Sequence, residues 1–223
     1  MERRNEMTTR TFYVPRVDGI GVTTGVSPDF EWFGGFALSQ AQRCVRSLHA
    51  AIAAERPGVR ILDTTSKSTD AFGVGLSAMN LTWNRPEGPC CLESVYQGSK
   101  VFADGFGPRP DLYARPGRET RKIVKARASE IVGYEMDGLT WPVSTGPAFF
   151  FYAALNALKC HPDYVSRLMG YDVFTDITFN PKKAANCTAQ AVAYFVSVAG
   201  SDRIDEVMDE LRSGRIIGSL DRI

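Results

Sequence analysis

Three polar side chains of different chemistry lie at helical spacing between residues 93 and 100. Glu93, Gln97 and Lys100 occupy positions i, i+4 and i+7 of the segment Leu92-Glu-Ser-Val-Tyr-Gln-Gly-Ser-Lys-Val-Phe102, which we predict to be a helix. On a helix this spacing aligns a carboxylate, an amide and an amine along one face. Apolar side chains fill the other directions. Spacing alone leaves two interpretations open, a polar face that lines a pocket and a polar face that is simply exposed.

Further polar side chains lie within apolar sequence on both sides of this segment. Ser77 and Asn80 precede it, and Asp176 and Asn186 follow it. A buried polar group needs hydrogen-bonding partners, so these residues favour the pocket.

The composition narrows the chemistry that the chain can perform. The chain has 223 residues, 44% hydrophobic and 23% charged, and 26 basic side chains stand against 25 acidic ones. These values predict a folded protein with no bulk attraction to nucleic acid or membrane. Only two histidines, His49 and His161, are present, and the five cysteines form no C-x-x-C pair, so we expect no metal and no cofactor. Catalysis would then depend on carboxylates, lysine or amides.

The segments that must position these residues predict an α+β fold. We expect a predominantly helical single domain with a small antiparallel β element, in which residues 1–58 form an N-terminal extension packed on the core. No apolar stretch is long enough to span a membrane and the first residues lack the apolar core of a signal peptide, so a cytoplasmic protein is expected. The expected elements are helices over about 39–55 (capped by Ser39), 92–102, 147–157, 162–169, 184–199 and from a cap at Ser201, extended segments over 59–65 and 73–83, and a hairpin over 131–143 that turns at Asp137-Gly138.

One block of the sequence is strongly basic. Between Arg109 and Arg127, seven basic residues stand against two acidic ones, a local net charge of +5. Two interpretations are open: a solvated helix face, or contacts to the phosphates of nucleic acid or ADP-ribose. The basic residues are Arg109, Arg115, Arg118, Arg121, Lys122, Lys125 and Arg127.

The segment 92–102 resembles the central motif of the NADAR family, in which a Glu is followed by an aromatic-Gln pair and by a Lys seven residues after the Glu. Leu76-Ser-Ala-Met-Asn-Leu81 is similar to the family's upstream Leu-Ser-Asn-Phe segment with one residue inserted. Phe151-Tyr-Ala-Ala-Leu-Asn-Ala-Leu-Lys-Cys-His-Pro-Asp163 resembles the helix and His-Pro turn that precede the family's acidic residue, here Asp176. Asn186 takes the place of the Asn that starts the family's last conserved helix. The family's Trp-Gly pair near the acidic residue is missing, and Phe179 is the nearest aromatic side chain that follows Asp176.

Within the family, the chain most resembles the NADAR antitoxins paired with DarT-type toxins, which are nucleic-acid ADP-ribosyltransferases. The resemblance covers about residues 60 to 200 and includes Ser66-Lys-Ser68, Phe174-Thr-Asp-Ile177 and Phe179-Asn-Pro-Lys-Lys183. It implies a NADAR-like catalytic domain over 59–223 that hydrolyses an N-glycosidic bond to ribose. Guanine-linked ADP-ribose on nucleic acid is the leading substrate, and a DarT-type toxin is the implied partner.

The resemblance and the residue chemistry together suggest a mechanism. If Lys100 is buried, desolvation lowers its pKa, and its neutral amine can attack the opened sugar aldehyde to give a Schiff base, a role that the resemblance also implies. Glu93 would move protons, and Asp176 would orient a ribose hydroxyl or stabilise the cationic intermediate. The expected substrate-binding residues are Gln97, Asn80, Ser77 and Asn186 for the sugar, Ser66, Lys67 and Ser68 for the diphosphate, and Phe179 for the base.

Two other functions remain open at this point. One is an N-glycosidase that acts on a free ribosylamine phosphate, such as a riboflavin-pathway intermediate, which the wider family also handles. The other is a module that binds ADP-ribose without catalysis, in which the Glu-Gln-Lys face only holds the ligand. Turnover of a modified oligonucleotide distinguishes the expected glycohydrolase from both.

Overall fold

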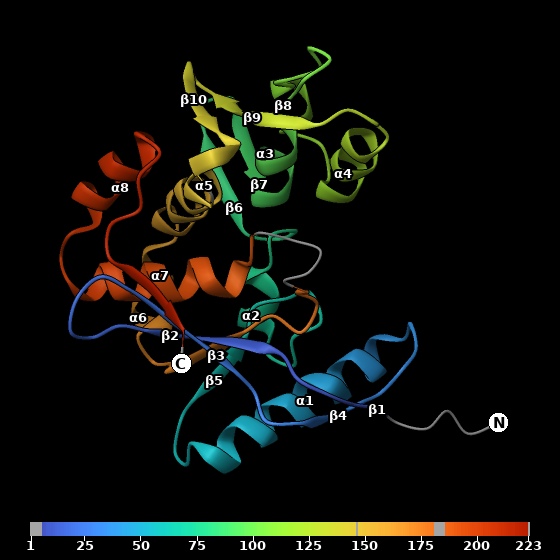
Figure 1. Cartoon of the computed structure of the whole chain (residues 1–223), viewed down its shortest axis with the longest axis vertical. Helices are drawn as coiled ribbons and strands as arrows, with labels where there is room; N and C mark the ends of the chain where they lie inside the picture. The colour runs from blue at the N-terminus through green and yellow to red at the C-terminus, as the bar shows by residue number, and fades with distance from the viewer. Residues whose placement is uncertain (1–5, 146, 181–185, 223) are drawn as a thin grey trace. The chain divides into compact units, whose positions relative to one another are not determined.

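The computed structural model describes residues 6–145, 147–180 and 186–222, and its contacts separate the chain into two compact units (Figure 1). Unit 1 comprises Met1–Ser77, Ser166–Ser201 and Gly218–Ile223, and unit 2 comprises Ala78–Val165 and Asp202–Ile217. The predicted boundary at residue 58 stays a prediction; within unit 1, strands from both sides of that position share one sheet.

Unit 1 is built on a five-stranded sheet in the order β12-β3-β2-β11-β5. The pairs β2–β3 and β2–β11 are antiparallel, whereas β11–β5 and β12–β3 are parallel. A separate antiparallel pair joins β1 and β4. The elements of unit 1 are β1 (Glu6–Thr8), β2 (Thr11–Pro15), β3 (Gly21–Val26), β4 (Phe30–Trp32), α1 (Leu38–Glu55), β5 (Ile61–Asp63), α2 (Ala71–Leu76), β11 (Val173–Thr175), α7 (Thr188–Gly200) and β12 (Ser219–Arg222).

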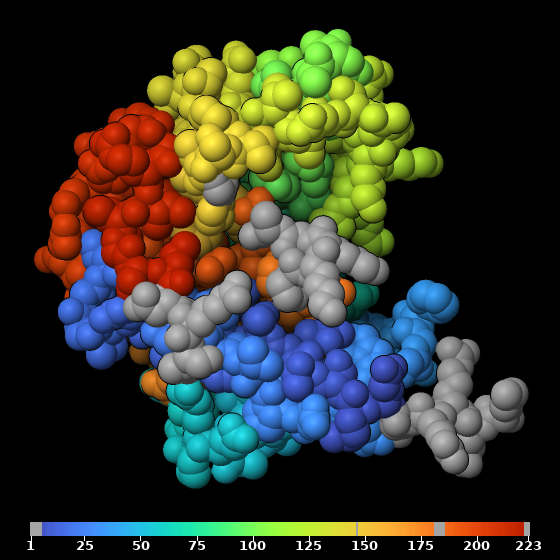
Figure 2. Space-filling view, viewed as in Figure 1, coloured from blue at the N-terminus to red at the C-terminus, as the bar shows by residue number. Residues whose placement is uncertain are grey.

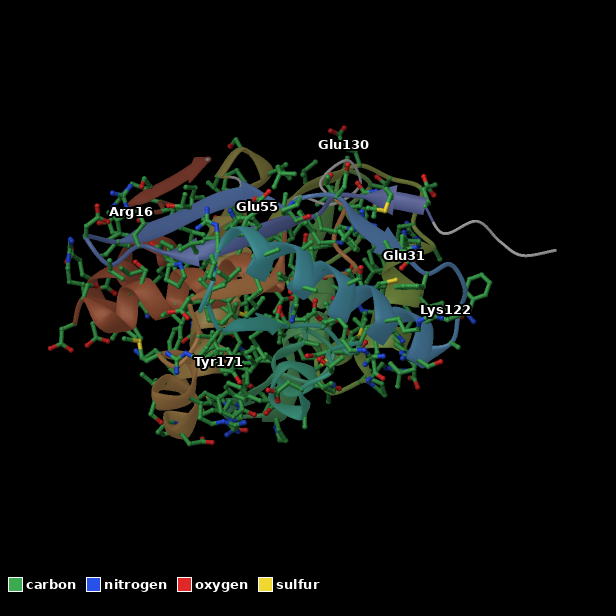
Figure 3. The ribbon with its side chains drawn as sticks, turned by 90° about the horizontal axis from the view of Figure 1, so that it is seen from below. Arg16, Glu31, Glu55, Lys122, Glu130 and Tyr171 are labelled. Carbon is green, nitrogen blue, oxygen red and sulfur yellow. The ribbon has the colours of Figure 1, made fainter. Side chains whose placement is uncertain are left out.

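Helices cover both faces of this sheet. Phe12 of β2 belongs to a buried cluster with Val45 and Leu48 of α1, and the next residue, Tyr13, hydrogen bonds with Cys187 at the start of α7. Successive side chains of a strand point to opposite faces, so α1 and α7 lie on opposite sides of β2. Figure 3 shows α1 from below, with Glu55 labelled at its end. The helix predicted over 39–55 is confirmed.

Unit 2 combines two small antiparallel sheets with helices. Its sheets are β6–β7 and β10-β9-β8, and β9 and β10 form the predicted hairpin. Asp137 and Gly138 at its turn both have positive φ, 52° and 77°, as a type I′ turn requires. The elements are β6 (Thr82–Arg85), β7 (Gly88–Cys91), α3 (Leu92–Gly98), β8 (Lys100–Phe102), a 3-10 helix (Pro110–Leu112), α4 (Gly117–Lys125), β9 (Ile131–Met136), β10 (Leu139–Pro142), a second 3-10 helix (Val143–Thr145), α5 (Ala148–Lys159) and α8 (Ile204–Arg212). The remaining helix, α6 (Pro162–Leu168), contains the division between the units.

The fold class is α+β, but the chain is not predominantly helical. Among the described residues, 8 α-helices stand beside 12 strands in several small sheets, with 42% helix and 22% strand. The small antiparallel element expected from the sequence is the β9–β10 hairpin. The strand predicted over 59–65 is confirmed as β5 (Ile61–Asp63). Most of the remaining strands were not predicted, because strands of three to six residues are too short for an alternating pattern to stand out.

Several predicted boundaries are wrong for local reasons. The extended segment predicted over 73–83 is instead α2, followed by a turn and β6, because the Asp70 carboxylate caps the helix by accepting the Phe72 amide at 2.8 Å. Ser39 lies in the first turn of α1 and does not cap it. Ser201 ends α7, and the last helix, α8, starts at Ile204. The expected helix over 184–199 is described only from Thr188, and residues 181–185 lie outside the described residues.

The described part of the chain contains neither a helix that could span a membrane nor a cluster of metal-ligating side chains. None of its helices is both long enough and apolar enough to cross a membrane. Within the same residues, His, Cys, Asp and Glu side chains form no group of three or more that could hold a metal ion.

Candidate active site

Lys100 lies at the end of a chain of polar contacts in unit 2. Its Nζ donates to Oε1 of Gln97 at 2.8 Å, and Nε2 of Gln97 donates to Oε1 of Glu93 at 2.9 Å. The same carboxylate oxygen accepts a hydrogen bond from Nε of Arg121 at 2.6 Å. An amine, an amide, a carboxylate and a guanidinium are therefore joined in one network, and its first three members are those predicted from the sequence.

The backbone of this network differs from the predicted helix. α3 ends at Gly98, and Lys100 is the first residue of β8, where it pairs with Tyr134 of β9. The carbonyl of Gly98 accepts the amide of Arg109 at 2.6 Å, and a Cβ on Gly98 would lie 2.8 Å from the Tyr113 ring. This tight packing accompanies the end of the helix. Lys100 therefore meets Gln97 across a helix-to-strand junction, not along a helix face.

Burial changes the chemistry of the Lys100 amine. The side chain is half-buried, and desolvation lowers its pKa from 10.5 to about 8; the Glu93 carboxylate opposes this shift, while the charges of Arg121 and Lys125 reinforce it. A substantial fraction of the amine is therefore neutral near pH 8. A neutral amine is a nucleophile, which an ordinary surface lysine at this pH is not.

An aromatic stack supports the amine from one side. Lys100 Nζ lies 4.9 Å from the centre of the Tyr96 ring, and the Tyr96 hydroxyl hydrogen bonds with that of Tyr134 at 2.9 Å. Both rings stack on Phe149 of α5. Tyr96 is not one of the predicted site residues, but it contacts Lys100, its neighbour at i+4. The aromatic stack therefore covers one side of the amine.

Glu93 is the most buried charged member of the network, with 4% of its surface exposed. Its carboxylate receives two donors, from Gln97 and Arg121, as a buried carboxylate requires. Its backbone amide donates to the carbonyl of Ala78 at 2.8 Å. This bond places the segment that contains Asn80 beside the start of α3, and Asn80 itself is exposed.

Arg121 reaches Glu93 because α4 packs very closely on α3. A Cβ on Gly117, one turn before Arg121, would lie 2.9 Å from Cβ of Glu93 and 3.0 Å from the Met79 sulfur. Only glycine leaves room for this approach. Its sequence position assigned Arg121 to the basic block and not to the site; the glycine one turn earlier was the available signal.

The other predicted residues belong to unit 1, where a buried carboxylate connects two of the candidate loops. Asp63, fully buried at the end of β5, accepts the amide and hydroxyl of Thr65 on Oδ1 and the Ile177 amide on Oδ2. Oδ2 also accepts the Thr175 hydroxyl. Thr65 precedes the Ser66–Ser68 turn, and Ile177 follows Asp176. Asp63 was not among the predicted site residues. Its hydrogen bonds connect the two loops and hold them next to each other.

Within these loops the predicted groups have defined local partners. Asp176 is half-buried; dense packing raises the pKa of its carboxyl, and the amide and hydroxyl of Thr178 oppose that shift. The amide of Phe179 donates to the Asp176 carbonyl at 3.1 Å. Asn186 directly precedes Cys187, the N-cap of α7. Residues 181–183 of the motif that starts at Phe179 lie outside the described residues.

The serines of unit 1 are partly occupied by turn contacts. The hydroxyl of Ser77 donates to the Val74 carbonyl at the end of α2, and that of Ser68 accepts the Asp70 amide. Lys67 and Ser66 are half-buried, and the Lys67 amide donates to the Thr65 hydroxyl. Turn contacts therefore engage the hydroxyls of Ser68 and Ser77, whereas for Ser66 and Lys67 the turn contact is made by the Lys67 backbone amide.

Unit 2 also contains a cavity of about 150 Å³ that is separate from the Lys100 network. The guanidinium of Arg85 in its wall already makes two hydrogen bonds to Asp137 and an ion pair with Glu87. Neither Lys100 nor Glu93 lines it.

The comparisons with known proteins agree with the motifs of this network. A family model described as DarT1-associated NADAR antitoxin matches residues 8–214, and the chain belongs to that family. A search of curated proteins returns no match to the chain.

Proposed function

We propose that this protein is an ADP-ribosyl glycohydrolase that removes ADP-ribose from modified guanine in nucleic acid and so reverses the action of a DarT-type toxin. The observation that supports this most strongly is the Lys100 amine, half-buried against Tyr96, with its pKa lowered to about 8 and with Gln97 connecting it to the Glu93 carboxylate. Such an amine suits covalent catalysis at a sugar carbon. Membership of the antitoxin family supports the biological context and the toxin partner.

The proposed reaction exchanges one carbon–nitrogen bond for another and then hydrolyses the product. The bond between the anomeric carbon and the ring oxygen breaks, the ring oxygen takes up a proton from water, and the anomeric carbon becomes doubly bonded to the guanine nitrogen. The neutral Lys100 amine then adds to that carbon. The carbon–guanine bond then breaks, its electron pair stays on the guanine nitrogen, and that nitrogen takes up the proton lost by the lysine. A protonated imine between Lys100 and the sugar remains. Water adds to the imine carbon, the lysine nitrogen leaves, and ADP-ribose is released; the net reaction consumes one water.

The side chains around Lys100 have separate tasks in this scheme. Glu93 carries the proton between the lysine and the departing guanine nitrogen, because it is the nearest carboxylate in the network. Gln97 holds the amine through its carbonyl oxygen. Arg121 keeps Glu93 in place and, through its charge, helps to lower the pKa of Lys100.

The roles of the unit 1 residues rest on the family motifs. We assign the ribose hydroxyl or the cationic intermediate to Asp176, the diphosphate to Ser66, Lys67 and Ser68, and the base to Phe179. Ser77, Asn80 and Asn186 complete the hydrogen bonds to the sugar. Asp63 accepts hydrogen bonds from Thr65 in one loop and from Ile177 in the other. This shared partner supports a common function for the two loops.

Reductive trapping tests the proposal directly. Sodium borohydride added during turnover of a guanine-ADP-ribosylated oligonucleotide should reduce the imine and leave an ADP-ribose adduct on Lys100, identified by mass spectrometry of the peptides. Lys100→Ala should give no adduct. Release of ADP-ribose by the wild-type protein without any trapped adduct would argue for direct attack by water, and no release on any ribosylated base would favour a binding module.

A further inference from the structure

The outward face of α4 carries an uninterrupted stripe of positive charge. Arg118, Lys122 and Lys125 occupy positions i, i+4 and i+7 of this helix, so they share one face, and all three are exposed. Lys122 is labelled in Figure 3, and in Figure 2 the yellow-green atoms of the α4 segment lie at the surface of unit 2. The stripe is about 10 Å long at the rise of an α-helix.

The orientation of this stripe is determined by the opposite face of the helix. Gly117, Thr120 and Val124 are buried, and α4 packs through them on α3 and its neighbours. The three cations therefore cannot turn inward without losing this contact. The acidic side chain of the helix, Glu119, is exposed beside the stripe, three residues before Lys122, and among the described residues it forms no ion pair with it.

The stripe lacks the acidic partners that most other arginines in the described part of unit 2 have. Within the described residues, Arg118, Lys122 and Lys125 form no ion pair, whereas the neighbouring arginines are paired, Arg109 with Asp111 and Arg127 with Asp104. Cations gathered on one face without internal acids raise the local positive potential, which favours a polyanion from outside.

The stripe is also continuous with the candidate active site. Arg121, between Arg118 and Lys125 on the same helix, bonds to the buried Glu93 carboxylate. One helix therefore presents cations to solvent and contacts the proposed proton carrier through its flank.

We infer that Arg118, Lys122 and Lys125 bind successive backbone phosphates of the nucleic acid that carries the modified base. The inference rests on the proposed function and adds to it the surface that holds the polymer. Phosphate contacts of this kind position a nucleic acid without reading its sequence. The contacts should therefore be strongly salt-dependent and insensitive to base sequence.

The test measures binding of an unmodified oligonucleotide, so no ADP-ribose or catalysis is involved. Anisotropy of a labelled 12-nucleotide single strand, as DNA and as RNA, is followed at several KCl concentrations. Lys122→Glu should weaken binding about tenfold at low salt and reduce the slope of log K against log salt by about 1. Arg118→Glu/Lys122→Glu should reduce it by about 2. The matched control Arg46→Glu, an exposed arginine of α1 in unit 1, should change neither affinity nor slope.

The outcomes separate this inference from the proposed function. Unchanged affinity and slope in the double variant, an equal loss in Arg46→Glu, or no binding by the wild-type protein would overturn the role of α4. If the double variant does not fold, Arg118→Gln/Lys122→Gln tests the same loss of charge. Oligonucleotide binding through α4 without release of ADP-ribose would contradict the proposed function and leave the inference standing. A preference for DNA or RNA in the wild type shows which polymer supplies the phosphates.

Discussion

Arg121 donates a hydrogen bond to the buried carboxylate of Glu93 across 2.6 Å, although 28 residues separate them in the chain. The bond joins α4 to the network that contains Lys100. Because Arg121 supports the proposed proton carrier, a substitution there would change catalysis. Lys122, which faces solvent, is the better probe of nucleic-acid contact.

Removing the Lys100 amine should abolish catalysis and leave the fold intact. Lys100→Ala deletes the proposed nucleophile, so release of ADP-ribose from a modified oligonucleotide should fall to the uncatalysed rate. The melting temperature should change little, because a desolvated ammonium contributes little net stability. Lys159→Ala, a lysine of α5 whose partner Asp205 is on the surface, is the matched control and should retain activity. Substantial activity in Lys100→Ala would exclude the covalent mechanism.

The rate should rise with pH through the pKa of Lys100. Only the neutral amine attacks, so kcat/KM should increase about tenfold per pH unit below about 8 and level off above it. Arg121→Gln removes a cation that lowers this pKa and should move the midpoint to higher pH. Glu93→Gln removes an anion that raises it and should move the midpoint to lower pH. Pre-steady-state rates from pH 6 to 10 give the midpoints; shifts in the same direction in both variants would refute the electrostatic account.

The close approach of α4 to α3 should depend on Gly117. Gly117→Ala removes a residue that is unfavourable in a helix, by about 1 kcal/mol on propensity alone. The new Cβ, however, would collide with Cβ of Glu93 and with the Met79 sulfur, so α4 must move away. We expect lower activity and a weakened Arg121–Glu93 bond without the stability gain typical of this substitution. Ile123→Ala, on the exposed side of the same helix, should keep full activity, and wild-type activity in Gly117→Ala would show that the close packing is not needed.

Asp63 should make the stability of the protein depend on pH. Burial raises the pKa of its carboxyl to about 7, so between about pH 4 and 7 the folded state holds a proton that the unfolded state has released. The free energy of unfolding should therefore fall as pH rises across this window. Asp63→Asn should remove this component and cost about 1–3 kcal/mol, because an amide cannot accept bonds on both sides from Thr65 and Ile177.

Urea unfolding at several pH values measures both effects. Asp205→Asn, a substitution of an exposed carboxylate that pairs with Lys159, is the control and should retain the fall in stability with rising pH. An unaltered profile in Asp63→Asn would assign the pH dependence to other groups.

Much of the site could be read from the sequence because its chemistry lies in a short segment. Glu93, Gln97 and Lys100 were identified from type and spacing, and the structure joins them through two hydrogen bonds. The expected helical alignment was wrong for Lys100, which lies on β8. The three side chains still meet because a strand that follows the helix after one residue keeps them within reach of one another.

What the sequence could not reveal depends on contacts between distant segments. Arg121, the partner of Glu93, comes from α4. The loops that contain Ser66 and Asp176 are connected by Asp63, which ends a short apolar strand and has no polar pattern around it. Strand order and helix packing decide such contacts, and neither is encoded in local periodicity.

By itself, the sequence determined the family motifs, the main helices, the β9–β10 hairpin and the residues with the right chemistry. Only the tertiary structure decided that the Lys100 amine is half-buried, that Arg121 faces Glu93 while its helix neighbours face solvent, and that short strands form a mixed five-stranded sheet. The physical reason is that residue type sets what a side chain can do, whereas burial and charged neighbours set its protonation state and partners, and these arise only when segments far apart in the chain pack together.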